Sequence, residues 1–277
     1  MKGKTVIITG GTSGIGAVAA ERLAAMGARI VLVARDRLRA EPTLTRLCEA
    51  NSDAAHTVHY ADLSRLPEMK RVSAEIAAAE PNIDVLINNA GAMFGTRQVT
   101  ADGLEMTFAL NHMAYFVVTK LLLGRLRPGA RIVSTSSDAH QYGRIDFNDL
   151  QSEQNYKGMR AYGTSKLCNI LFTRALARRL EGTGITANCL HPGFVDTRFG
   201  DNNQGLLGFG FGLAKRIAAI TPEKGARTIV YLASSDEVAG KSGGYYYKCA
   251  PATPAETARS DGDAERLWEI SEKIANG

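Results

Sequence analysis

The sequence predicts an α/β fold, a doubly wound parallel sheet of about seven strands with helices on both faces. Short runs of apolar and β-branched residues alternate along the chain with longer segments of helical periodicity. The runs are almost continuously apolar, as in residues 29–34, which is typical of strands covered on both sides. A single domain over residues 1–277 is expected, because α/β folds of this length often form one unit.

Each element follows from its own pattern. Strands are expected at residues 5–9, 29–34, 57–60, 84–88, 131–135 and 186–190, with a last strand around 244–248 and a last helix around 264–275. Between the first two strands, apolar residues recur at helical spacing from position 15 to position 26, and Gly27 closes the helix. A strand, a crossover helix and a further strand form a βαβ unit, so the strands are expected to be parallel.

Two long stretches interrupt this alternation and are expected to be functional loops. Residues 138–160 are polar and irregular, and residues 197–220 are rich in Gly and Phe. The second stretch carries Leu206, Leu207, Phe209, Phe211 and Leu213 between glycines, which predicts a mobile apolar lid over a substrate. Two alternatives remain open, a segment packed permanently in the core or a patch that contacts a membrane surface.

Composition excludes several classes of protein. A hydrophobic content of 45% with 22% charged residues is typical of a folded domain, and a net charge of +5 without a basic run gives no indication of nucleic-acid binding. Four dispersed cysteines without a CxxC pair, and no recognisable secretory leader, predict reduced, packed thiols in a cytoplasmic protein. No apolar run approaches the roughly 18 residues of a membrane span, and no metal site is expected from the histidine spacing.

A glycine-rich turn follows the first strand directly. Residues 9–16 have the sequence Thr-Gly-Gly-Thr-Ser-Gly-Ile-Gly and open the first helix. Glycines permit a tight turn and let the backbone approach a pyrophosphate, whose charge is stabilised by free N–H groups at the start of the helix. A glycine cluster alone is weak evidence, since any tight strand-to-helix turn has it, but a strand before and a helix after it predict a Rossmann-type dinucleotide site.

The Gly-xxx-Gly-x-Gly spacing resembles the turn of the short-chain dehydrogenase/reductase family, and further motifs of that family follow in order. They are Asp62-Leu63, Asn88-Asn89-Ala90-Gly91, Asn111, Ser136-Ser137, Tyr162-Gly-Thr-Ser-Lys166 and Pro192-Gly193-Phe194-Val195-Asp196-Thr197. Six ordered matches span almost the whole chain. The resemblance implies an oxidoreductase that transfers a hydride between a nicotinamide cofactor and an alcohol or carbonyl compound.

By this resemblance, the cofactor is bound at the ends of the strands. The implied residues are Gly10, Thr12, Ser13, Gly14, Ile15, Gly16, Arg35, Asp62, Leu63, Asn89, Ala90, Gly91, Tyr162, Lys166, Pro192, Gly193, Val195 and Thr197. Arg35 ends the second strand, where a guanidinium can pair with the 2′-phosphate of NADP, although the carboxylate of Asp36 would repel that phosphate. NADP(H) is therefore the expected cofactor, with NAD(H) as the alternative.

The catalytic residues implied by the resemblance are Asn111, Ser137, Tyr162 and Lys166. Tyr162 and Lys166 are four residues apart and share one helical face, so the ammonium is expected to lower the pKa of the phenol toward the working range. Tyr162 then exchanges a proton with the substrate oxygen while Ser137, rather than Ser136, orients it. Asn111 is implied to hold a water near Lys166, or else it caps a distorted turn.

Residues 139–180 and the terminal Ala264-Glu-Arg-Leu-Trp-Glu-Ile motif resemble the retinol dehydrogenase and WW-domain oxidoreductase branch of the family. The chain begins almost at its first strand, without an anchor helix or a WW module, whereas family members that act on retinol usually work at a membrane. A hydrophobic aldehyde, ketone or alcohol is therefore the expected substrate, and retinol itself is not specifically implied. Two other functions stay open: a non-catalytic NADP-binding regulator and a sugar-nucleotide epimerase. A homodimer through the helices that carry Asn111 and Tyr162 is also expected from the family.

Overall fold

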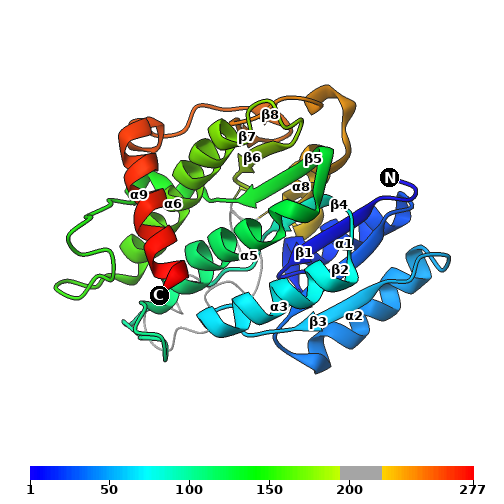
Figure 1. Ribbon diagram of the computed structural model, residues 1–277, viewed down its shortest axis with the longest axis horizontal. Coiled ribbons are helices and arrows are strands. Elements are labelled where there is room, and N and C mark those ends of the chain that lie inside the picture. The colour runs from blue at the N-terminus through cyan, green and yellow to red at the C-terminus, as the bar shows by residue number, and fades with distance from the viewer. Residues whose placement is uncertain (194–219) are drawn as a thin grey trace.

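The computed structural model describes residues 1–193 and 220–277, and its centre is one eight-stranded sheet in the order β3-β2-β1-β4-β5-β6-β7-β8 (Figure 1). The strands are β1 (Thr5–Thr9), β2 (Arg29–Ala34), β3 (Thr57–Tyr60), β4 (Ile83–Asn88), β5 (Leu126–Thr135), β6 (Thr186–Leu190), β7 (Tyr245–Tyr247) and β8 (Ala250–Pro251). The first seven pair in parallel, which confirms the predicted fold class. The short β8 adds an unpredicted antiparallel edge.

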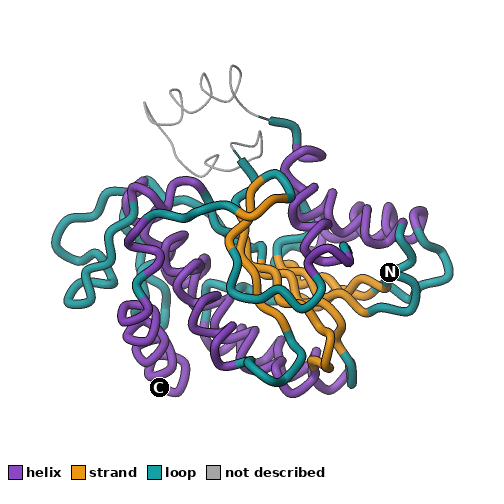
Figure 2. The backbone as a smooth tube through the Cα atoms, turned by 90° about the horizontal axis from the view of Figure 1, so that it is seen from above, coloured by secondary structure: helices purple, strands orange, loops and turns teal. Residues whose placement is uncertain are grey.

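Helices cover both faces of the sheet (Figures 1 and 2). They are α1 (Gly14–Ala25), α2 (Arg37–Ala50), α3 (Leu66–Ala79), α4 (Met106–Phe108), α5 (Ala114–Leu122), α6 (Gly158–Arg179), α8 (Pro222–Ser234) and α9 (Asp261–Asn276). Side chains alternate along each strand: Val6 and Ile8 pack in the cluster formed with α1, α2 and α8, whereas Ile7 packs in the cluster formed with α3, α5, α6 and α9. Two apolar layers therefore enclose the sheet.

The strand order places the carboxyl ends of β1 and β4 side by side. The chain moves outward from β1 through β2 to β3, then returns to β4 on the other side of β1. The helices that follow these two neighbouring strands lie on opposite faces of the sheet. This arrangement opens a crevice at the carboxyl ends of the strands, where ligands of such sheets bind. The predicted glycine turn and the Asn89 segment both lie at this position.

The segment Met106–Arg125 contains α4, a π-helical turn (Ala109–Met113), α5 and a short 3₁₀ turn. Within the described residues it is the one helix long and apolar enough to cross a membrane, with a mean hydropathy of 1.3. However, 72% of its most apolar 18-residue window is buried inside the structure, where α5 packs in the core beside α3. Such burial is typical of the central helix of an α/β core.

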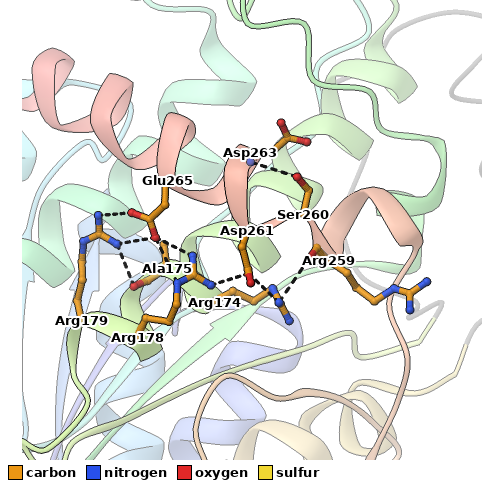
Figure 3. A network of polar contacts seen from close by, with 9 residues as sticks. All are labelled: Arg174, Ala175, Arg178, Arg179, Arg259, Ser260, Asp261, Asp263 and Glu265. Carbon is orange, nitrogen blue, oxygen red and sulfur yellow. Dashed lines mark hydrogen bonds and ion pairs between the residues drawn. The ribbon is translucent and has the colours of Figure 1, made fainter.

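The last helix, α9, packs against α6 of the same chain (Figure 1). Trp268 contacts Phe116 of α5 and Phe172 of α6, with ring centroids 4.9 and 5.9 Å away. Figure 3 shows the polar part of this contact, in which arginines of α6, among them Arg178, pair with Asp261 and Glu265 of α9. The outer surfaces of the two helices expected to form a homodimer are therefore partly covered by the chain's own C-terminal helix.

Candidate active site

The glycine turn is packed so closely that two of its positions exclude a side chain. Gly10 has φ +67°, and a Cβ placed there would lie 2.7 Å from the Cα of Ala90. A Cβ at Gly16 would overlap the carbonyl oxygen of Gly10. Among the described residues no side chain caps the start of α1 and its first turn holds no acidic residue, so its N–H groups and the positive end of its dipole are available to an anion. The turn fits a dinucleotide pyrophosphate.

Asn89 holds this turn against the end of β4. Its Nδ2 donates to the carbonyl oxygen of Gly10 at 3.1 Å, and its backbone N–H donates to Thr9 Oγ1 at 3.0 Å. Thr135 Oγ1, at the end of β5, donates to Asn89 Oδ1 at 3.3 Å. The side chain of Asn89 therefore joins three strand ends, and Ala90 also donates its N–H to Thr9 Oγ1.

Arg35 and Asp36, which follow β2, present an exposed guanidinium and an engaged carboxylate. Arg35 is exposed directly after β2. The carboxylate of Asp36 caps α2, accepting from the N–H of Leu38 at 2.9 Å, and also pairs with Arg39 at 3.6 Å. The repulsion expected from Asp36 is thus reduced, because its charge is partly compensated by a helix N-terminus and a cation.

The segment after β3 is a tight polar turn. Asp62 Oδ1 accepts from the backbone N–H and the hydroxyl of Ser64, at 3.0 and 2.8 Å. The side chain of Leu63 is buried in the core, which leaves only its backbone to face the crevice. Both residues lie at the same edge of the sheet as the glycine turn.

Tyr162 and Ser137 meet across the end of β5. Ser137 follows that strand as the N-cap of a short 3₁₀ helix, and its side chain shares a hydrogen bond with the Tyr162 hydroxyl. Tyr162 is 8% exposed on α6. Burial raises its pKa above the usual value and the Ser137 hydrogen bond lowers it, so burial dominates. The expectation that a neighbouring ammonium lowers this pKa is wrong, because burial outweighs the interactions that lower it.

Ser136 points the other way. It is buried, and its hydroxyl donates to the carbonyl oxygen of Lys166 at 2.7 Å. Ser136 therefore joins β5 to α6 and has no role at the Tyr162 hydroxyl, whereas Ser137 is the serine that the structure places there.

Lys166 lies one helical turn after Tyr162. Its Nζ is 5.7 Å from the centroid of the Tyr162 ring and donates to the carbonyl oxygen of Thr135 at 3.1 Å. The side chain is 3% exposed, and burial lowers its pKa to about 8. No carboxylate of residues 1–193 or 220–277 pairs with it, so burial makes this lysine easier to deprotonate and sensitive to any anion that approaches.

Asn111 lies in the π-helical turn before α5 and is fully buried. Its Oδ1 accepts from the N–H of Ala92, and its Nδ2 donates to the Ala92 carbonyl oxygen and to Ser165 Oγ, each at 2.9 Å. A Cβ at Gly91 would lie 3.1 Å from Asn111 Oδ1 and 3.4 Å from Lys166 Nζ. Asn111 thus joins the loop after β4 to the helix that carries Tyr162 and Lys166.

The remaining predicted residues fall in part outside the described residues. Pro192 and Gly193 follow β6 at the same sheet edge, with Gly193 at φ +90°. Val195, Thr197 and the expected lid at 197–220 lie outside the described residues, apart from Ile220. The prediction that all four cysteines are packed is wrong for Cys48, which is exposed because it lies on the solvent side of α2.

Comparisons with known proteins agree with this geometry. The family model described as short chain dehydrogenase matches residues 4–205. Retinol dehydrogenase 14 of Mus musculus is 44% identical, over 98% of this chain and 86% of its own length, and retinol dehydrogenase 13 of Homo sapiens is 38% identical, over 98% and 84%.

Solved structures give the same result. A crystal structure of an uncharacterised protein from Mycobacterium paratuberculosis matches with a TM-score of 0.80 and 32% identity, over 99% of this chain and 94% of that one. A short chain dehydrogenase from Burkholderia cenocepacia in complex with NADP matches with a TM-score of 0.70 and 28% identity, over 88% and 95%. The chain belongs to the short-chain dehydrogenase family, in its retinol dehydrogenase-like branch, and is an oxidoreductase.

Proposed function

We propose that the protein is an NADP(H)-dependent oxidoreductase that interconverts a hydrophobic alcohol and the corresponding aldehyde or ketone, with Tyr162 as the proton donor and acceptor. The observation that carries this proposal is the hydrogen bond between Tyr162 and Ser137, at the sheet edge where the glycine turn of α1 also lies. A proton donor and an orienting hydroxyl are thereby held together next to a site that fits a dinucleotide.

A nicotinamide cofactor bound at the glycine turn would supply or accept the hydride. Ser137 and Tyr162 bind the carbonyl oxygen of the substrate, and the Tyr162 hydroxyl donates the proton that completes the alcohol. Burial keeps the pKa of Tyr162 above its usual value, so the phenol keeps its proton at neutral pH, which is the state required for carbonyl reduction. Oxidation of the alcohol uses the same residues with the steps reversed, so that Tyr162 accepts the proton of the substrate hydroxyl.

Lys166 acts on this exchange by its charge. Its ammonium is close enough to the Tyr162 ring to stabilise a phenolate after the proton has left, and the low-dielectric surroundings strengthen that interaction. Asn111 keeps the loop after β4 at a fixed position relative to Lys166. Lys166 therefore contributes by its charge, and Asn111 contributes by fixing the loop.

The preference for NADP(H) rests on Arg35. Its exposed guanidinium at the end of β2 can pair with a 2′-phosphate in two-point geometry, and position 35 carries no acidic side chain. Asp36 is engaged at the start of α2. A related structure is a complex with NADP, which supports the same assignment.

The substrate class rests on two features. The relatives are named retinol dehydrogenases, and residues 206–213 of this sequence carry five large apolar side chains. A nonpolar alcohol or aldehyde fits both, because apolar pockets bind such ligands by burial of surface. This class includes retinoids and medium-chain aldehydes.

The test is a panel of nonanal, all-trans-retinaldehyde, cyclohexanone and the corresponding alcohols, each assayed with NADPH or NADP⁺ and with NADH or NAD⁺. We expect substrate-dependent oxidation of NADPH with the nonpolar aldehydes and a lower kcat/KM with NADH. A protein that binds NADPH but turns over no carbonyl or alcohol would instead be the non-catalytic regulator considered above.

A further inference from the structure

His140 links the catalytic serine to the C-terminal part of the chain. It lies in the 3₁₀ helix that begins after Ser137 and is 2% exposed. Its Nδ1 is 2.7 Å from the carbonyl oxygen of Ser137, and its Nε2 is 3.0 Å from the backbone N of Ala255. The imidazole therefore spans two backbone segments that are 118 positions apart in the sequence, Ser137 and Ala255.

These two contacts determine where the ring carries its proton. The backbone N–H of Ala255 is a donor, so Nε2 must accept and therefore bears no proton. The carbonyl oxygen of Ser137 is an acceptor, so Nδ1 must donate. The neutral Nδ1–H tautomer is the single form that satisfies both bonds.

The surroundings of the ring favour that neutral form. Tyr245 of β7 packs edge-on against His140 with ring centroids 5.3 Å apart, and the Tyr245 ring also faces His191 at 5.7 Å. Burial lowers the pKa of His140, while the Ser137 carbonyl and the charge of Asp138 oppose this shift. Asp138, His191 and Tyr245 are titratable groups beside His140, on its own turn, after β6 and on β7.

The position of the Ser137 side chain depends on this turn. Ser137 Oγ accepts from the N–H of Ala139 at 3.2 Å, and Ser137 O accepts from both the N–H and the Nδ1–H of His140. The backbone on both sides of Cα is thus fixed, and with it the direction in which Oγ faces Tyr162. A catalytic hydroxyl misplaced by about 1 Å loses much of its effect.

We propose that His140 is a positioning residue for Ser137, which as a neutral Nδ1–H imidazole fixes the serine carbonyl and anchors the segment around Ala255 to the catalytic edge of the sheet. The inference rests on the proposed role of Ser137. It predicts that loss of the hydrogen bond between His140 and Ser137 slows the chemical step, whereas loss of the hydrogen bond between His140 and Ala255 does not.

Two substitutions separate the two bonds. In His140→Asn, the side-chain amide can donate from nearly the place of Nδ1 and keep the Ser137 bond, whereas in His140→Gln the longer amide reaches the place of Nε2 and keeps the Ala255 bond. We expect kcat for reduction of nonanal by NADPH to fall roughly 10- to 100-fold in His140→Gln and about threefold or less in His140→Asn, with KM for NADPH unchanged in both.

His56 is the matched control. Its two ring nitrogens also contact backbone groups, the N–H of Ile30 at 3.0 Å and the carbonyl oxygen of Asn51 at 3.2 Å. These contacts lie at the amino ends of the strands, away from Ser137 and Tyr162. His56→Asn and His56→Gln should lower the urea midpoint and leave kcat within about twofold. Equal kcat for His140→Gln and His140→Asn, after correction for stability, would overturn the proposal.

A measurement that needs no turnover separates this inference from the proposed function. Two-bond ¹H–¹⁵N correlation spectra of the histidine-labelled protein at pH 7.5, with His140 assigned by its loss in His140→Asn, report the tautomer directly. We expect the Nδ1–H form. An Nε2–H form of His140 would contradict the inference, whether or not the protein reduces a carbonyl substrate. An Nδ1–H form in a protein that turns over no carbonyl substrate would contradict the proposed function alone.

Discussion

Lys166 Nζ donates to the carbonyl oxygen of Thr135 at 3.1 Å, so the ammonium of α6 is held at the end of β5. The same oxygen also accepts from Asn169 Nδ2 at 3.3 Å and from Tyr115 Oη at 3.4 Å. Three side chains from two helices thus converge on one backbone carbonyl. This contact fixes the helix that carries Tyr162 relative to the strand that ends in Ser137.

The burial of Lys166 gives a prediction for stability. Because its folded-state pKa of about 8 lies below the unfolded value near 10.4, the unfolded chain binds an extra proton between these two pH values. Stability from this group therefore rises with pH across that window. We expect the unfolding free energy of the wild type to increase relative to Lys166→Met between pH 8 and pH 10, measured by urea denaturation.

The comparison with Lys166→Met is necessary because buried phenols and thiols titrate in the same window with the opposite sign. Burial raises the pKa of Cys168 and Cys189 to about 12 in the folded state. The unfolded chain therefore releases these thiol protons first, and the unfolding free energy of the protein falls as pH rises. The Cys168 term is shared by the two proteins and cancels in the difference. The Cys189 term cancels when Cys189→Ser is made in both proteins, because Cys189 interacts electrostatically with Lys166. A difference that stays flat from pH 8 to pH 10 would show that Lys166 is not desolvated as described.

Arg35 and Asp36 give a prediction for cofactor preference. Arg35→Asp removes the cation that pairs with a 2′-phosphate and puts a carboxylate in its place, so we expect the ratio of kcat/KM for NADPH to that for NADH to fall by about 10- to 100-fold. Initial rates with both cofactors measure this ratio.

Asp36→Asn is the control for that experiment. An asparagine caps a helix about as well as an aspartate, so the acceptor for the Leu38 N–H remains, and the ratio should change by less than about threefold. If Asp36→Asn shifts the preference as strongly as Arg35→Asp, the net charge of this edge and not the guanidinium determines it.

Trp268 gives a prediction for the packing of α9. It is 9% exposed, contacts Phe116 and Phe172, and lies under the guanidinium of Arg179 at 4.2 Å. Trp268→Ala should lower the unfolding free energy by about 3–5 kcal/mol, because a large cavity replaces the ring. Leu38→Ala, at an 80% exposed position, should change it by less than about 0.5 kcal/mol. A small effect of Trp268→Ala would mean that α9 is not part of the cooperative core.

The parallel sheet was predictable because each strand is buried on both faces and leaves a nearly continuous apolar run. The exceptions have physical reasons. β5 begins at Leu126, five residues before the predicted start, because an irregular pairing with β4 admits an exposed Arg-Pro-Gly sequence into the strand. β8 was missed because its turn uses Lys248 and Cys249 at positive φ in place of glycine or asparagine.

The candidate site was predictable where a motif specifies a side chain, and less so where partners are backbone atoms. Tyr162, Lys166 and Ser137 lie at the sheet edge that the family resemblance implies. No motif pointed to His140, since both of its hydrogen-bond partners are backbone groups, which leave no side-chain pattern in a sequence. The pKa of Tyr162 was predicted with the wrong sign, because spacing shows a cation nearby but does not show burial.

The most direct test of the central claim is the rate of NADPH oxidation by Tyr162→Phe with a carbonyl substrate that the wild type reduces. Phenylalanine keeps the buried ring and removes only the hydroxyl that Ser137 contacts. We expect NADPH binding, followed by its fluorescence, to be unchanged and kcat to fall by about 10²- to 10⁴-fold. Turnover by Tyr162→Phe at the wild-type rate would contradict the assignment of Tyr162 as the proton donor.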